Sequence, residues 1–269
     1  MTSAARVVLP SPTLFRNVPL QPRERINEKT HTPCPAVMSP EIDRLVSEVT
    51  VPDSTLTPDR STTPSAAAPP KPDITIDFAP PSAAQDADLI ARVAALVNKV
   101  YFDAEGGIFH DGYQRTSTAE IAQFIKDQRL ALARLVRPSP SPSAGAGVGT
   151  GAGDVVGCVY VKTLSPTLGD FGMLALDVTY RGGGLGRDLV RFAEDHCRRI
   201  GCTKMQLELL VPTTFEHALK TRMQAWYLRM GYRIVKLGSF QDEYPALAPL
   251  LTGPADYKIF EKDLTSSTP

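Results

Sequence analysis

The chain has 269 residues, 42% of them hydrophobic, which is enough for one large or two small domains with a buried core. Its 29 basic and 29 acidic side chains give a net charge of zero, which argues against a dedicated nucleic-acid-binding protein. No stretch approaches the length of a membrane span, so neither a nucleic acid nor a membrane is an expected partner.

The cysteines and histidines, four of each, are scattered without the spacing of a metal site. We therefore expect no metal and interpret the cysteines as free thiols in a reducing compartment. Four prolines before residue 23 would break the amphipathic helix of a mitochondrial targeting segment, so a cytoplasmic location is expected rather than a mitochondrial one.

Residues 1–72 differ in composition from the rest of the chain. They contain more than half of the 24 prolines, and Phe15 is their only aromatic residue. Such a segment buries too little apolar surface to offset its ordering entropy, which predicts a disordered tail. The folded domain is predicted at residues 73–264, with a short C-terminal tail at 265–269.

The domain begins with a strand and two helices. Residues 73–79 alternate between apolar and polar side chains, as a strand does. Residues 82–101 have helical spacing, and Ser82 is the expected cap. A Thr-Ser-Thr run followed by Glu120 resembles a capping box and predicts a second helix over 118–127.

Three strands are predicted in the middle of the domain. The first, at 130–136, precedes a low-complexity insertion of Ser-Pro and Gly-Ala steps at 138–154, which predicts a surface loop. The other two, at 155–164 and 171–179, are joined by a turn at 165–169 and form a hairpin.

The last part of the domain begins with a glycine cluster at residues 180–186 that leads into a helix ending near residue 200. The remaining predicted elements are strands at 204–211, 232–237 and 256–263 and a helix at 221–230. Helices that alternate with strands in this order predict a mixed α/β layer fold.

The glycine cluster has the chemistry of a phosphate site. Unpaired backbone N–H groups at a helix N-terminus attract anions, and glycine allows the backbone to approach them closely. Arg181, Arg187 and Arg191 supply positive charge on either side. Two known loops do not fit. A P-loop needs Gly-Lys-Ser/Thr at its end, and a G-x-G-x-x-G fingerprint that starts at Gly182 would end at an arginine.

What fits is Arg-x-x-Gly-x-Gly, at Arg181, Gly184 and Gly186, which resembles the coenzyme A pyrophosphate loop of the GCN5-related N-acetyltransferase superfamily. The strand at 174–177 is similar to the family's fourth strand, and the segment from Tyr227 to Gly231 and Tyr232 is similar to its Tyr-x-x-x-Gly-Phe/Tyr ending. Together these motifs cover about residues 73–264 in the family's order.

The resemblance implies the family's fold, a mixed, mostly antiparallel central sheet with flanking helices. It also implies acetyl-CoA as cosubstrate and transfer of its acetyl group to a primary amine, by direct attack in a ternary complex. The residues expected to contact the cofactor are Leu174, Ala175, Leu176, Arg181, Gly182, Gly183, Gly184, Leu185, Gly186 and Arg187.

Two catalytic residues are predicted. Tyr227 matches the family's tyrosine, and its phenol, with a pKa near ~10, can donate a proton to the leaving thiolate. Its place on an apolar helical stripe equally suits a core residue. Glu208 faces away from the apolar residues of its strand and is the predicted base, with a structural salt bridge as the alternative. Asp177 is a further possibility for the base.

One position departs from the family pattern. Lys220 stands where many relatives have an asparagine that contacts the cofactor, so Lys220 or Arg222 is expected to meet phosphate instead. The acceptor, a small-molecule or peptide amine, is expected among acidic and aromatic side chains of two segments. These are Tyr101, Asp103, Glu105, Asp111 and Tyr113 in the first, and Asp242, Glu243 and Tyr244 in the second.

Two other kinds of function remain open at this level. One is a non-catalytic acyl-CoA-binding module of the same fold that acts as a regulator or scaffold. The other is a nucleotide-dependent enzyme that uses the glycine cluster for ATP or NAD. The sequence indicates neither an oligomeric state nor the identity of the amine.

Overall fold

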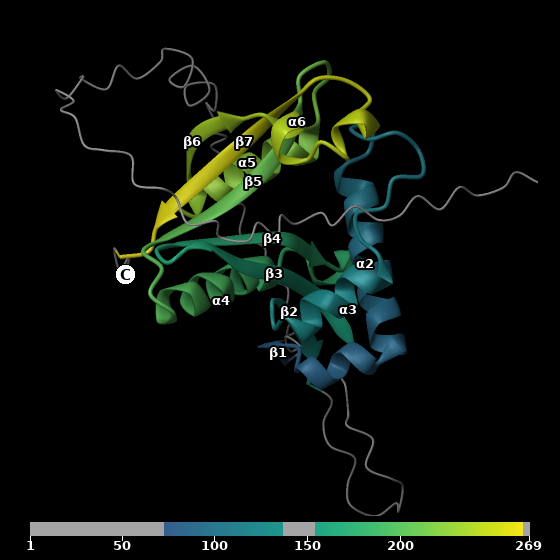
Figure 1. Ribbon diagram of the computed structural model, residues 1–269, viewed down its shortest axis with the longest axis vertical. Helices are drawn as coiled ribbons and strands as arrows, with labels where there is room; N and C mark the ends of the chain where they lie inside the picture. Colours follow the sequence, from purple (N-terminus) through teal and green to yellow (C-terminus); the bar gives the residue numbers. More distant parts are fainter. Residues whose placement is uncertain (1–72, 137–153, 266–269) are drawn as a thin grey trace, which may run out of the picture. The chain divides into compact units, whose positions relative to one another are not determined.

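The structure is a computed structural model that describes residues 73–136 and 154–265 (Figure 1). The predicted N-terminal tail, nearly all of the predicted loop at 138–154 and the last four residues lie outside the described residues. None of the described helices combines the length and apolar character that a membrane crossing requires.

Within the described ranges, seven strands form one sheet in the order β1-β2-β3-β4-β5-β7-β6. The strands are β1 (Ile74–Phe78), β2 (Leu130–Leu135), β3 (Val155–Ser165), β4 (Leu168–Leu176), β5 (Lys204–Pro212), β6 (Arg233–Gly238) and β7 (Ala255–Asp263). All neighbouring strands are antiparallel except β4 and β5, which are parallel. The predicted fold class, a mixed and mostly antiparallel sheet with flanking helices, is confirmed.

Helices cover both faces of this sheet (Figure 1). They are α2 (Ala87–Ala104), α3 (Thr118–Lys126), α4 (Leu185–Arg199), α5 (Ala218–Arg229) and the short α6 (Phe240–Glu243). On β2, Ala131 and Ala133 join one core cluster with α4, whereas Leu130 and Leu132 join a second cluster with α2 and α3. Because strand side chains alternate, β2 is buried on both faces.

Some element boundaries differ from the predictions. Ser82 lies in a 3-10 turn (Pro81–Gln85) that follows Pro80, and the helix begins only at Ala87. Its cap is Asp86, whose carboxylate accepts a hydrogen bond from the Leu89 N–H at 2.9 Å. The start of the second helix agrees better with the prediction, because the Ser117 hydroxyl caps α3 and accepts a hydrogen bond from the Glu120 N–H at 3.1 Å.

The two parallel strands β4 and β5 stay together over only three pairs, from Leu168 with Lys204 to Asp170 with Gln206. In contrast, β5 pairs with β7 along its whole length, up to Pro212. Beyond Asp170 and Gln206 the two strands therefore separate, and the sheet opens between its two halves (Figure 1).

A bulge lies on β4 where this opening begins. Cys158 of β3 pairs with Ala175 and Tyr160 pairs with Gly172, so that two residues of β4, Met173 and Leu174, face one residue of β3. Met173 has a φ of +46°, which is unfavourable for a side chain of its size. The bulge thus bends β4 at the edge of the opening.

A buried carboxylate links α4 to the C-terminal strands. Glu194 accepts hydrogen bonds from the Tyr232 hydroxyl at 2.7 Å and from Lys262 Nζ at 2.8 and 2.9 Å. Replacing Glu194 by alanine would leave the buried Tyr232 hydroxyl without its acceptor and separate Lys262 from its counter-ion. We expect the free energy of unfolding to fall by about 3 kcal/mol, measured by urea denaturation.

The matched control is Glu261→Ala, which removes a more exposed carboxylate that pairs with Lys204 at 2.8 Å. That change should cost less than about 1 kcal/mol, because surface ion pairs contribute little. Equal losses in the two variants would contradict the importance of the buried network.

Candidate functional site

An open channel of about 390 Å³ runs beside the N-terminus of α4. Its walls come from the glycine cluster, from β4, from the C-terminal half of α2 and from α5. The lining residues are Val100, Tyr101, Ala104, Leu174, Leu176, Arg181, Gly182, Gly184, Gly186, Arg187, Leu219, Lys220, Met223 and Trp226. Seven of the ten residues predicted to contact the cofactor are among them. Of the other three, Ala175 and Leu185 are packed in the core, and Gly183 is not part of the wall.

The glycine cluster has a backbone that only glycine adopts readily. Gly182 and Gly184 have φ values of +83° and +93°, and a Cβ added to either would meet no atom within 4 Å. Gly184 is the N-cap residue of α4, so the first amides of the helix lie beside this empty space. With Arg181 and Arg187 also in the channel wall, the residues present fit a diphosphate.

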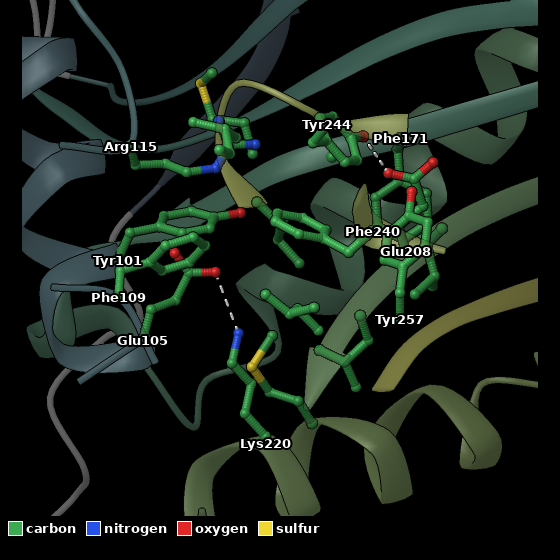
Figure 2. Close-up of a pocket in the computed structure, with 18 of the residues that line it drawn as sticks. Tyr101, Glu105, Phe109, Arg115, Phe171, Glu208, Lys220, Phe240, Tyr244 and Tyr257 are labelled. Carbon is green, nitrogen blue, oxygen red and sulfur yellow. Dashed lines mark hydrogen bonds and ion pairs between the residues drawn. The ribbon is translucent and has the colours of Figure 1, made fainter. Parts of the chain in front are cut away.

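A second, smaller cavity of about 120 Å³ lies where β4 and β5 separate (Figure 2). Residues 171–174 of β4 and 207–210 of β5 form two of its walls. Aromatic side chains of other elements close it, namely Tyr101, Phe109, Tyr113, Tyr227, Phe240, Tyr244 and Tyr257. Both predicted catalytic residues, Glu208 and Tyr227, line this cavity.

The channel and the cavity share four lining residues, Tyr101, Leu174, Lys220 and Met223. Leu174 belongs to the bulge of β4. A ligand held by the glycine cluster could therefore extend along β4 and reach a second ligand in the cavity.

Tyr227 lies on α5, and 4% of its surface is exposed. It packs in the core cluster with Phe171, Tyr232 and Phe260 at ring-centroid distances near 6 Å. Burial raises the pKa of Tyr227 above its ordinary value, so the phenol is protonated at neutral pH. Tyr227 is thus a core residue that also forms part of the cavity wall, and its role as a proton donor stays a prediction.

Glu208 lies on β5 with its side chain directed into the cavity (Figure 2). Its neighbours Leu207 and Leu209 are buried in the core, as the alternation along the strand predicts. One carboxylate oxygen accepts a hydrogen bond from the Tyr244 hydroxyl at 2.5 Å. Burial, together with the charge of Glu208, raises the pKa of Tyr244 and of Tyr257, so both phenols are protonated next to this carboxylate.

Asp170 is a second carboxylate in the cavity wall, and the sequence analysis did not identify it. It is 3% exposed, and its Oδ2 atom lies 3.5 Å from Lys162 Nζ. Burial raises the pKa of Asp170 to about 7; Lys162 and Gln206 oppose the shift, and the charge of Glu208 adds to it. The signal that could have identified Asp170 is the one used for Glu208, a single acid within an apolar strand.

Two other sequence interpretations need correction. Lys220 does not point to a phosphate site, because it is buried and its Nζ atom lies 3.3 Å from Glu105 Oε1 (Figure 2). Arg222 is exposed and lines neither the channel nor the cavity. Asp177 also lies outside both, since its carboxylate accepts hydrogen bonds from the Thr179 N–H and hydroxyl at 2.9 and 2.7 Å.

Only some of the residues predicted to bind the acceptor amine line the cavity. Tyr101, Glu105, Tyr113 and Tyr244 line the cavity. The other four acids are exposed and lie outside its wall; they are Asp103, Asp111, Asp242 and Glu243. Arg115, which the sequence did not indicate, lines the cavity on the side opposite Glu208 (Figure 2).

In the described part of the chain, no group of three or more His, Cys, Asp or Glu side chains could hold a metal ion.

A helix N-terminus with an open glycine cluster is typical of proteins that bind a phosphorylated ligand. The sequence profile of a family described as Acetyltransferase (GNAT) domain matches residues 146–234, which include β3, β4, the glycine cluster, α4, β5 and α5. The predicted resemblance to the GCN5-related N-acetyltransferase superfamily is therefore confirmed for this segment, which is about a third of the chain. No protein with a curated function matches it.

Several solved structures match the chain at low sequence identity. N-acetylglutamate synthase from Neisseria gonorrhoeae, complexed with coenzyme A and N-acetyl-glutamate, is 16% identical with a TM-score of 0.45. That match covers 72% of this chain and 36% of the synthase, so the chain spans about a third of that protein.

Two further structures match over nearly their whole length. A chain of the NatC complex bound to Gag peptide and CoA is 18% identical with a TM-score of 0.45, and the match covers 71% of this chain and 98% of that one. An acetyltransferase of the GNAT family from Staphylococcus aureus MU50 is 12% identical with a TM-score of 0.46, with coverage of 71% and 99%.

Proposed function

We propose that the chain is an acetyl-CoA-dependent N-acetyltransferase that acetylates a primary amine by direct attack in a ternary complex. The observation that carries this proposal is the junction of the channel and the cavity at Tyr101, Leu174, Lys220 and Met223. In the proposed complex the glycine cluster binds the diphosphate of the cofactor, and the cavity binds the amine. The reacting groups then meet at the bulge of β4.

Each part of the cavity has a proposed role. Glu208 accepts a proton from the attacking amine, directly or through water. The backbone at the bulge, around Leu174, donates a hydrogen bond to the developing oxyanion. Tyr227 donates a proton to the departing sulfur; burial raises the pKa of its phenol, so the proton is present at neutral pH. The small size of the cavity favours a small molecule, or a single amine-bearing side chain or terminus of a peptide, as the acceptor.

The proposal is tested by release of free thiol from acetyl-CoA in the presence of a broad panel of primary amines. At least one amine should raise thiol release well above hydrolysis without an amine. Binding of acetyl-CoA by calorimetry with no turnover on any amine would favour the non-catalytic acyl-CoA-binding module instead. Thermal stabilisation by ATP or NAD but not by coenzyme A would favour a nucleotide-dependent enzyme.

Replacing Tyr227 by phenylalanine should lower kcat by about 10- to 100-fold and leave the affinity for acetyl-CoA unchanged. The ring still fills its place in the core, while the proton donor for the leaving sulfur is lost. Steady-state kinetics and calorimetry measure the two quantities.

The matched control for this variant is Tyr232→Phe, in the same aromatic cluster at a ring-centroid distance of 6.1 Å. The Tyr232 hydroxyl bonds to Glu194, so its loss should lower stability without a comparable effect on kcat. A fall in kcat of equal size in both variants would show that Tyr227 acts through packing alone.

A further inference from the structure

The cavity where β4 and β5 separate has charged side chains of opposite sign on its two sides. Five charged side chains line it, namely Glu105, Arg115, Asp170, Glu208 and Lys220. Three of them belong to ion pairs, because Lys220 Nζ lies 3.3 Å from Glu105 Oε1 and Lys162 Nζ lies 3.5 Å from Asp170 Oδ2. The other two, Arg115 and Glu208, lie on opposite sides of the cavity (Figure 2). A ligand that spans the cavity therefore meets a cation on one side and an anion on the other.

The position of Arg115 is fixed by a clamp on the backbone and by an aromatic ring. Arg115 directly precedes Thr116, whose N–H donates to Asn98 Oδ1 and whose C=O accepts from Asn98 Nδ2, both at 3.0 Å. Asn98 belongs to α2, so the segment before α3 is tied to that helix. The guanidinium lies over the Tyr101 ring, with Cζ 5.0 Å from the ring centroid. A side chain held in this way loses little freedom when it binds a ligand.

The guanidinium of Arg115 has the chemistry to bind a carboxylate. Arginine keeps its positive charge at any physiological pH, and its five N–H donors form a planar fork that matches the two oxygens of a carboxylate. The charges of Glu105 and Glu120 already act on Arg115. With five donors, the fork can bind a ligand carboxylate in addition to its protein contacts.

The opposite side of the cavity suits an amine. Glu208 accepts one hydrogen bond, from the Tyr244 hydroxyl at 2.5 Å, and a carboxylate has further lone pairs for a second donor. Phe240, Tyr244 and Tyr257 lie on this side, with ring centroids 5.1 to 5.8 Å apart (Figure 2). The faces of aromatic rings attract ammonium groups. An amine and a carboxylate in one small molecule would thus each meet a complementary wall.

We propose that the acceptor is an amino acid, whose carboxylate binds Arg115 while its amine lies on the side of Glu208. This rests on the proposed acetyltransferase function. The amine nitrogen bonds to the acetyl carbon and the carbon–sulfur bond breaks, so the products are an N-acetyl amino acid and coenzyme A. The cavity of about 120 Å³ is smaller than the sites of drug-sized ligands, which have about 300–1,000 Å³.

Other amines fit the charges of the cavity less well. A diamine would bring its second cation towards Arg115, and like charges repel. A peptide N-terminus would present a neutral amide where the amino acid presents a carboxylate, so the guanidinium would lose a charged hydrogen bond. The structure therefore favours a small zwitterion over both.

The test compares each amino acid with its carboxamide, which keeps the amine and the shape but lacks the negative charge. The pairs are made from glycine, alanine, leucine, phenylalanine, β-alanine and γ-aminobutyrate, which vary the side chain and the spacing of the charges. Thiol release by the full chain at saturating acetyl-CoA gives the ratio of kcat/KM within each pair. The ratios are compared between the wild type and Arg115→Met, so that the different basicity of the two amines cancels.

For the best pair, the ratio of amino acid to carboxamide should fall by at least about 10-fold in R115M. Arg115→Lys keeps the charge without the fork and should retain part of the ratio. A purely structural role of Arg115 would lower both members of a pair alike. Ratios that coincide in the wild type and R115M would therefore overturn the proposal.

Arg129→Met is the matched control. Arg129 is also partly buried beside a phenol, with Nη1 3.5 Å from the Tyr160 hydroxyl, but it lines neither the channel nor the cavity. Its ratio should stay within about twofold of the wild type. A fall in ratio as large as that of R115M would overturn the assignment to Arg115.

A second measurement needs no turnover. Each of the six amino acids is titrated by calorimetry into the full chain saturated with coenzyme A. At least one should bind the wild type about 10-fold more tightly than R115M. Equal binding would overturn the carboxylate site, as would acetylation confined to amines without a carboxylate. Binding through Arg115 with no acetylation of any amine would instead count against the proposed function and leave the carboxylate site standing.

Discussion

Replacing Gly184 by valine should weaken the binding of acetyl-CoA by about 100-fold or more. The φ of Gly184 is +93°, so a β-branched residue would force the backbone out of its conformation and turn the first amides of α4 away from the channel. Losing two hydrogen bonds to a charged group costs about 3 kcal/mol, which corresponds to the expected change in affinity. Isothermal calorimetry with acetyl-CoA measures it directly.

Gly201 provides a matched control at the other end of the same helix. Its φ is +96°, a Cβ added there would also meet no atom within 4 Å, and it lines neither the channel nor the cavity. Gly201→Val should therefore cost a similar amount of stability, about 1–2 kcal/mol, and leave the affinity for acetyl-CoA unchanged. Wild-type affinity in Gly184→Val would mean that the cofactor binds elsewhere.

The order of the longer helices and strands could be predicted from the sequence, because the apolar residues in each recur with the period of a helix or of a strand. The alternation along β5 and the helical spacing in α4 both place apolar residues in the core clusters where the structure has them. The short elements were missed. The helix α6 has four residues, too few to show a period, and the 3-10 turn at Pro81–Gln85 displaced the cap from Ser82 to Asp86.

The cofactor side of the site could be predicted better than the acceptor side for a physical reason. The glycine cluster is local, because one turn and one helix start contain most of its chemistry. The cavity depends on where β4 and β5 stop pairing, a relation between residues 168–170 and 204–206 that no local pattern indicates. Asp170 was missed because of a strand boundary. The predicted strand began at Phe171 and left Asp170 between the turn at 165–169 and the strand, whereas β4 begins at Leu168.

The direction of the Glu208 side chain, unlike its chemical role, follows from a local pattern. Alternation along β5 predicts that Glu208 points away from Leu207 and Leu209, and the structure confirms that direction. Its action as a base stays a prediction, since a carboxylate bonded to Tyr244 also suits a structural contact. The two interpretations differ in what a neutral isostere would do to the rate.

Glu208→Gln should lower kcat/KM for the amine by about 10²- to 10⁴-fold, the usual contribution of a general base. Glutamine preserves the shape and can still accept the hydrogen bond of Tyr244, but it cannot take a proton. The affinity for acetyl-CoA should remain unchanged, because Glu208 lines the cavity and not the channel. Steady-state kinetics at saturating acetyl-CoA, together with calorimetry, separates the two effects.

Glu261→Gln is the control for this change, because Glu261 lies on β7 outside both the channel and the cavity and pairs with Lys204. Its kcat/KM should stay within about twofold of the wild type, as expected for a surface ion pair. If Glu208→Gln also kept the wild-type rate, the proton would have to leave through another group. In that case the carboxylate of Glu208 would serve only to hold Tyr244 and close the cavity.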